Sequence, residues 1–388
     1  MITDDHLALL RLLACGGASA PRRRLLGQAR TPAAALEAGA STWRACGLEP
    51  AQVAVLRAAA MPPGRVLDWL SIPGHHLLGW HEPDYPALLR HVNNPPLALF
   101  VVGDPLALWQ PAVAVVGSRR PSPGGLDNAR GFARALVRSG LTVTSGMAAG
   151  IDTAAHRASL AEGGHTIAVL GTGPDVAYPP ANDGLHADLL EQGIVVSEFP
   201  PGTGPRPEHF PRRNRIIAGL ALGTLVIEAA ARSGALITAR LAAEAGREVF
   251  AVPGSVHNPM ARGCHRLIGE GATLVQDIDD LTGALAPLAL RLADDLRRRL
   301  GAPTSGDHTL GAGLPASPGG GAPGPGLKEP CDSPDHNTLW ESLGHDPTDM
   351  DQLVERSGLT AAQVSSMLLV MELEGRVTSQ HGRYFRRH

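Results

Sequence analysis

Residues 141–171 read LTVTSGMAAGIDTAAHRASLAEGGHTIAVLG and decide the fold class. Two short runs, Leu141–Gly146 and Thr166–Gly171, are rich in β-branched residues, and a segment of helix-compatible composition lies between them. Both runs are largely apolar without a regular alternation of polar residues, which indicates strands covered on both faces. Strands of this kind, connected through helices, are typical of a parallel sheet.

The same pattern recurs on both sides of this stretch. Further strands are predicted at VAVVG (113–117), IVVSE (194–198), TLVIEA (224–229) and EVFAVPG (248–254), each followed by a helix-compatible segment. Upstream, LALFVVGD (97–104) is predicted to form an edge strand of the same sheet. The fold class is therefore α/β, a doubly wound parallel sheet of extended Rossmann-like type over residues 80–285.

The flanking segments predict further domains in this chain of 388 residues. Residues 1–70 contain short helical patterns, with Thr31 and Pro32 as an N-cap and first-turn pair, and predict a small α domain. Residues 302–334 are nearly half Gly and Pro, which predicts a flexible linker. Residues 335–388 follow the order helix, helix, turn, helix, hairpin and predict a winged-helix domain.

The charge balance excludes a globally basic nucleic-acid binder. Lys and Arg number 34 against 37 Asp and Glu, a net charge of -3, so phosphate recognition must come from local clusters. Four scattered cysteines without a CxxC pair favour a reduced cytoplasmic protein, and no metal or cofactor is expected. Since no apolar run approaches about 18 residues, we expect no membrane association.

The candidate site lies where parallel strands end, because helix N-termini present unpaired amides there. The first loop, GSRRPSPGG (117–125), places Gly117 at a tight turn, Ser118 as a hydroxyl, and Arg119 and Arg120 beside the next helix. The second loop contains Ser145, Gly146 and Gly150, whose glycines suggest that another group approaches the backbone closely. Both loops are therefore predicted to bind phosphate.

Two later segments complete the predicted anion site. FPRRNRIIAGL (210–220) concentrates three arginines beside an amide side chain, and the candidate residues are Phe210, Arg212, Arg213, Asn214 and Arg215. Phe210 is suited either to stapling a helix or to stacking on a base, and Asn214 either to capping or to phosphate contact. Ser233 and Gly234 open a helix at the same rim, and Glu228 is available to pair with one of the arginines.

Catalytic motifs are absent from the sequence. GTGPDVAYPPAND (171–183) lacks the GxGxxG spacing of a dinucleotide site, and neither GxxxxGK[ST], HExxH nor GxSxG occurs. The sequence therefore favours binding over catalysis, with no catalytic residues.

Six segments of the chain, taken in order, closely resemble the DNA processing protein A (DprA, or Smf) family. They are VVGSRRPSPGG, SGMAAGIDTAAH, GTGPDVAYPPAN, SEFPPG, FPRRNRIIAGL and VIEAAARSGALITARLAAEAGREVFAVPG. The resemblance spans roughly residues 80–280 and extends to a winged-helix appendage and an N-terminal module of SAM-like or helix-hairpin-helix type. It implies a homodimer that binds single-stranded DNA and loads RecA onto the strand during transformation or recombination. It also implies phosphate contacts from Arg119 and from the RNRI segment, including Arg215. Pro180 departs from a pattern in which relatives often carry a basic residue.

Two other functions are compatible with parts of the sequence. A phosphoribohydrolase-like nucleotide-processing enzyme would share the Rossmann-type fold, but its PGGxGTxxE signature is split here between PGSVHNP and GTLVIEA in the wrong order. A transcription regulator would use the winged helix on duplex DNA. Residues 335–388 hold eight acidic residues against five arginines, which disfavours duplex contact and favours protein contact for that module.

Overall fold

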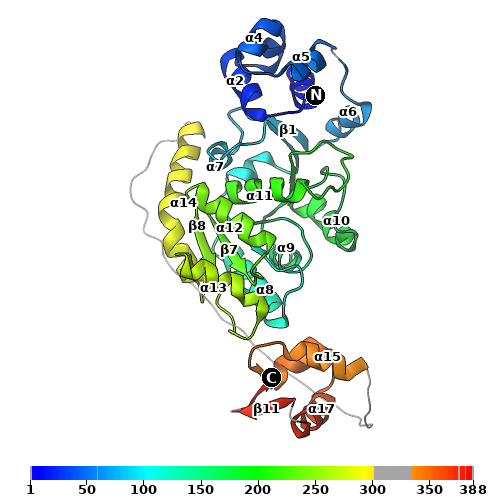
Figure 1. Ribbon diagram of the computed structural model, residues 1–388, viewed down its shortest axis with the longest axis vertical. Helices are drawn as coiled ribbons and strands as arrows, with labels where there is room; N and C mark the ends of the chain where they lie inside the picture. The colour runs from blue at the N-terminus through cyan, green and yellow to red at the C-terminus, as the bar shows by residue number, and fades with distance from the viewer. Residues whose placement is uncertain (1, 59, 301–333, 375, 381, 387–388) are drawn as a thin grey trace.

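The computed structural model describes residues 2–58, 60–300, 334–374, 376–380 and 382–386. A central sheet with helices on both faces joins an N-terminal group of helices at one end and a small C-terminal domain at the other (Figure 1). The predicted α/β fold with a helical N-terminal part and a winged-helix part is confirmed. The predicted linker at 302–334 lies, except for Pro334, outside the described residues.

The described part of the sheet has nine strands in the order β1-β2-β6-β5-β4-β3-β7-β8-β9. Strands β3 to β9 are mutually parallel where they pair, whereas β2 is antiparallel to both β1 and β6. The direction in which successive strands are added reverses at β3, with β4, β5 and β6 on one side of it and β7 and β8 on the other. Ligands of doubly wound sheets bind at such a point. The strands are β1 (His75–Gly79), β2 (Ala98–Val102), β3 (Ala112–Gly117), β4 (Thr142–Ser145), β5 (Thr166–Leu170), β6 (Ile194–Ser197), β7 (Gly223–Ile227), β8 (Glu248–Ala251) and β9 (Thr273–Leu274).

The prediction that residues 97–104 form an edge strand is wrong. All five residues of β2 are buried because β1 pairs with one side of it and β6 with the other. The edge strand is β1, whose sequence HHLLG is too polar at its start to be recognised as a strand. Strand β9, at the opposite edge, contains only two residues, and both are exposed.

Helices cover both faces of the sheet. One face packs against α7, α11, α12 and α13, and the other against α8, α9 and α14, so the strands from β3 to β7 are buried on two sides, whereas β1, β8 and β9 are partly exposed. This burial explains the continuous apolarity of the strand sequences. The helices of this domain are α7 (Ala87–Arg90), α8 (Pro123–Arg138), α9 (Ile151–Ala161), α10 (Asp183–Gln192), α11 (His209–Leu220), α12 (Gly234–Glu244), α13 (Arg262–Gly269) and α14 (Ile278–Leu300), with 3-10 turns η1 (Pro105–Trp109), η2 (Pro180–Asn182) and η3 (Pro259–Ala261).

Six short helices form the N-terminal part, and their core is continuous with the sheet through residues such as Trp69 and Phe100. Thr31 caps the third helix by accepting a hydrogen bond from the Ala34 amide, with Pro32 as its first residue, as predicted. The helices are α1 (Asp4–Ala14), α2 (Ser19–Ala29), α3 (Pro32–Glu37), α4 (Gly39–Ala45), α5 (Pro50–Arg57) and α6 (Gly64–Leu70).

The C-terminal domain has a core of its own, centred on Leu339, Leu353 and Leu368. Gly358 ends the second helix in the left-handed conformation at φ 68°, where glycine costs least. The elements are α15 (Pro334–Leu343), β10 (Thr348–Asp349), α16 (Met350–Ser357), α17 (Ala361–Leu373), β11 (Val377–Gln380) and β12 (Arg383–Arg386), the order of a winged helix.

Within the described ranges, every helix is either too short or too polar to cross a membrane.

Candidate nucleic-acid interface

A groove of about 730 Å³ opens at the carboxyl ends of β3, β4 and β7, at the point where the strand order reverses. We call it the strand-end groove. Its walls come from the loop after β3, the loop after β7, and one face of α11. The lining residues are Val116, Gly117, Ser118, Arg119, Arg120, Ala148, Asp152, Tyr178, Pro207, Phe210, Pro211, Arg213, Asn214, Ile217, Ala230, Arg232, Ser233, Gly234, Ala235, Ile237, Thr238 and Met260.

Three exposed arginines border this groove. Arg119 and Arg120 follow β3, and Arg232 lies opposite them in the loop after β7. In the part of the chain that the structure describes, none of the three guanidinium groups takes part in an ion pair. The acidic residue that lines the groove, Asp152, is only 6% exposed. The accessible charge of the groove is therefore positive.

The loop that carries Arg119 and Arg120 is held by hydrogen bonds. The Ser118 hydroxyl oxygen accepts from the Arg120 amide at 3.0 Å, and the Ser122 hydroxyl oxygen caps α8 by accepting from the Gly125 amide at 3.1 Å. Since the backbone is fixed at both ends, the two arginine side chains project from a rigid loop.

Glu228 ties this loop to two others. Among the described residues it pairs with no arginine, contrary to the expectation from the sequence. Its carboxylate accepts from the Ser122 amide at 2.7 Å, from the Ser122 hydroxyl, and from Asn258 Nδ2 at 2.7 Å. The Glu228 backbone is left-handed at φ 52°, which is unfavourable for a residue with a side chain. Only glycine fits at position 125, because a Cβ placed there would lie 2.5 Å from this carboxyl group.

The start of α12 supplies the opposite wall. Ser233 caps this helix by accepting a hydrogen bond from the Ala235 amide at 3.2 Å. Gly234 faces open space, since a Cβ built there meets no atom within 4 Å. Both residues lie at the groove as predicted, next to Arg232.

One face of α11 forms the third wall. Phe210 and Asn214 line the groove, and the ring of Phe210 lies 5.1 Å from that of Tyr178, which is 38% exposed. Asn214 donates weakly to the Gly234 carbonyl at 3.4 Å. The groove thus combines an aromatic pair with cationic side chains.

Arg213 lies beneath the groove and is only 4% exposed. Its guanidinium donates to the Gly146 carbonyl at 2.7 Å and to the Val169 carbonyl. Burial lowers the pKa of Arg213 to about 10, and nearby Asp152 opposes that shift. Because Nη1 of this buried guanidinium donates to two backbone carbonyls, Arg213 supports the groove floor.

Arg212 and Arg215 lie on the other side of α11, outside the groove. Both donate to Oε1 of Glu198, at 3.0 Å and 2.7 Å, and Arg215 also donates to the Asn94 and Arg212 carbonyls. Burial would raise the pKa of Glu198, but these two arginines hold it below its usual value. Positions 212 and 215 are three residues apart and share a helix face, whereas 210, 213, 214 and 217 share another.

The three predicted residues of the second loop do not line the groove, although Ala148 of the same loop does. Ser145 is fully buried and donates to the Val115 carbonyl at 2.6 Å. At Gly146 and Gly150 the group that lies close to the backbone is another part of the protein. A Cβ at Gly146 would lie 2.5 Å from the Arg213 guanidinium, and one at Gly150 would lie 2.3 Å from the Ser118 carbonyl oxygen. Gly117 likewise admits the Ile227 carbonyl of the neighbouring strand.

Sequence reasoning missed Arg232 and Tyr178. Arg232 directly precedes the Ser233 cap, so its position at a helix start was a usable signal. Tyr178 belongs to a loop after β5 whose course cannot be read from local sequence. Among the described residues, no group of three or more His, Cys, Asp or Glu could hold a metal ion.

Comparison with known proteins gives consistent results. The family described as DNA recombination-mediator protein A matches residues 76–286, and the DprA winged helix domain matches residues 323–383. Protein Smf of Escherichia coli K12 is 40% identical over 82% of this chain and 79% of that protein. DNA processing protein DprA of Streptococcus pneumoniae is 49% identical over 51% of this chain and 70% of that protein. The X-ray structure of DprA from S. pneumoniae aligns with a TM-score of 0.64 at 36% identity, covering 73% of this chain and 98% of that one.

Proposed function

The chain belongs to the DNA recombination-mediator protein A family, also named DprA or Smf, and from this premise we propose that it binds single-stranded DNA in the strand-end groove. Arg119, Arg120 and Arg232 contact successive phosphates, and the amides at the start of α12 assist them. The observation that carries the proposal is that these three exposed arginines surround one groove without acidic partners.

The aromatic pair favours a single strand over a duplex. Tyr178 and Phe210 present ring surface beside the arginines, and an unpaired base can stack on such a surface whereas a base inside a duplex cannot. Each stacked base contributes about 1–3 kcal/mol in proteins of this kind. The arginines then hold the backbone while the aromatic side chains hold bases.

The role that we propose in the cell rests on family membership. We propose that the protein acts in the cytoplasm as a non-enzymatic homodimer that loads RecA onto the strand in recombination or transformation. A binding role agrees with a groove that offers cations, amides and aromatic rings. Phosphate contact by Arg215, expected from the resemblance, is not part of this proposal, because the Arg215 side chain is only 9% exposed and is bound to Glu198.

Salt-dependent titration of a labelled single strand tests the groove. Each phosphate contact that is lost should reduce the slope of log K against log salt concentration by about 0.7. We expect this reduction for Arg119→Ala and for Arg232→Ala. Arg240→Ala is the matched control, since Arg240 is an exposed arginine of α12 outside the groove and pairs with Glu244. Equal slopes for all variants would reject the groove as the phosphate site.

RecA loading needs its own assay. The rate at which RecA assembles on a single strand, followed by its strand-dependent ATPase activity, should rise when the wild-type protein is added. The Arg119→Ala variant should give a smaller rise because less protein is bound to the strand. A protein that binds the strand normally but leaves the RecA rate unchanged would restrict the function to DNA binding.

A further inference from the structure

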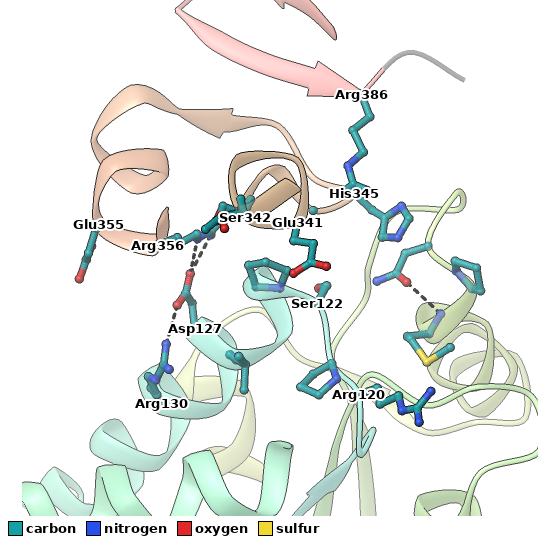
Figure 2. Close-up of a pocket in the computed structure, with 18 residues that line it drawn as sticks. Arg120, Ser122, Asp127, Arg130, Glu341, Ser342, His345, Glu355, Arg356 and Arg386 are labelled. Atoms are coloured by element: carbon teal, nitrogen blue, oxygen red, sulfur yellow. Dashed lines mark hydrogen bonds and ion pairs between the residues drawn. The ribbon is translucent and has the colours of Figure 1, made fainter. Parts of the chain in front are cut away.

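The winged helix sits against the N-terminal end of α8, next to the strand-end groove. A cleft of about 1000 Å³ separates the two domains, with residues of α8 on one side and residues of α15 and α16 on the other (Figure 2). Arg120 and Met260 line both this cleft and the strand-end groove. The two spaces therefore adjoin at Arg120, and a strand leaving the groove at this end would meet the winged helix.

An ion pair anchors the winged helix to α8. Arg356 of α16 donates to Oδ2 of Asp127 through Nε at 3.0 Å and through Nη2 at 2.7 Å (Figure 2). The Arg356 side chain is 15% exposed, and Asp127 also accepts from Arg130 through Oδ1 at 3.1 Å. Two donors from one guanidinium fix the orientation of the contact more firmly than a single hydrogen bond does.

The winged helix also brings acidic groups to the start of α8. A Cβ built on Gly124 would lie 3.0 Å from Oδ2 of Asp346, so this carboxylate lies against the first turn of the helix. The N-terminal end of a helix attracts anions, including the phosphates of nucleic acids. Glu341 extends from α15 into the cleft on the side of α8 (Figure 2). Carboxylates of the winged helix thus lie at the start of α8, a position that would also attract a phosphate.

We propose that the winged helix is an internal competitor of the DNA strand, docking at the start of α8 and closing the Arg120 end of the strand-end groove. This inference rests on the proposed function, since it concerns access to the same groove. Docking and strand binding at this end oppose each other, because the docked domain places Asp346 against the start of α8, directly after the loop that carries Arg120. The apparent affinity for the strand is then reduced by the fraction of molecules in which the domain is docked.

The Arg356→Ala variant gives a result opposite in sign to that expected from charge alone. Removing a cation weakens the attraction of a protein for DNA if the charge merely contributes to the surrounding field. If Arg356 holds a competitor in place, its removal releases the groove and strengthens binding. Since a partly exposed ion pair of this kind is worth 0.2–1 kcal/mol, we expect an increase in affinity of up to about 5-fold.

Further full-length variants separate the contact from the overall charge and from misfolding. Arg383→Ala is the matched control, because Arg383 is an exposed arginine of the same domain and does not line the cleft. Arg356 also donates to Ser342 and Thr348 within its own domain, so Asp127→Ala provides a second way of breaking the contact without altering the winged helix.

Titration of one labelled single strand into these proteins at fixed salt decides the matter. The inference predicts tighter binding by Arg356→Ala and Asp127→Ala, and unchanged or slightly weaker binding by Arg383→Ala. It is overturned if Arg356→Ala binds no more tightly than Arg383→Ala while the wild-type protein binds with its normal salt slope. Failure of the wild-type protein to bind the strand at all would instead reject the proposed function, and this inference with it.

Discussion

Replacement of Arg215 by alanine is expected to destabilise the fold while leaving the salt dependence of DNA binding unchanged. The guanidinium donates to Glu198 at 2.7 Å, to the Asn94 carbonyl at 2.9 Å and to the Arg212 carbonyl at 2.8 Å. Its removal leaves a buried carboxylate with Arg212 alone as its cationic partner. Breaking a buried ion pair costs roughly 3–5 kcal/mol, and because Arg212 remains we expect the lower end, about 3 kcal/mol.

Urea unfolding followed by tryptophan fluorescence measures this loss, and titration of a single strand over a salt series measures the slope. Arg119→Ala is the complementary variant. Because Arg119 is exposed and has no ion-pair partner among the described residues, its removal should change stability by less than about 0.5 kcal/mol. It should also reduce the slope by about 0.7.

The two variants together test whether α11 divides its arginines between two roles. The reasoning is refuted if Arg215→Ala retains wild-type stability, or if it lowers the salt slope as much as Arg119→Ala does. The first result would mean that the ion pair with Glu198 contributes little to stability, and the second that the Arg215 guanidinium contacts phosphate.

Three further predictions follow from the structure. Glu228→Ala removes the acceptor for Ser122 and Asn258, so it should lower the unfolding free energy by about 2–3 kcal/mol and should also weaken binding of the strand. Urea unfolding and DNA titration measure the two effects, and wild-type affinity for the strand would contradict the prediction. Burial lowers the pKa of His156 from 6.5 to about 3, so between these pH values the unfolded chain binds a proton that the folded chain does not. The unfolding free energy should therefore fall by up to about 1.4 kcal/mol per unit of falling pH from this group, a contribution that His156→Gln should lack in urea unfolding over a pH series. Tyr178→Ala should weaken binding of a single strand by about 1–3 kcal/mol without altering the salt slope, and a changed slope in titration would contradict a stacking role.

The strands of the main sheet could be predicted because burial on two faces leaves a continuous apolar sequence. Six predicted runs correspond to β3 to β8. Strand β1 could not be found in this way, since His75 and His76 begin it and its pairing with β2 depends on residues 19 to 27 positions away. The position of β2 inside the sheet depends on the same long-range pairing.

The loops of the site were predictable, but the direction of the side chains on α11 was only partly so. Helical periodicity places Arg212 and Arg215 on one face and Phe210 and Asn214 on another, so the sequence already contained that division. Which face meets the groove depends on the position of Glu198, an acidic residue at the end of a different strand. The groups that approach Gly146 and Gly150 also come from distant segments, and local sequence cannot distinguish them from a ligand.

Titration of a labelled single strand and of a duplex of equal length, each over a series of salt concentrations, tests the central claim most directly. Three arginines that contact phosphates predict a slope of log K against log salt concentration of about −2 for the single strand. Stacking of unpaired bases on Tyr178 and Phe210 predicts tighter binding of the single strand than of the duplex. Equal affinity for the two forms of DNA, or an affinity for the single strand that does not change with salt, would contradict the account.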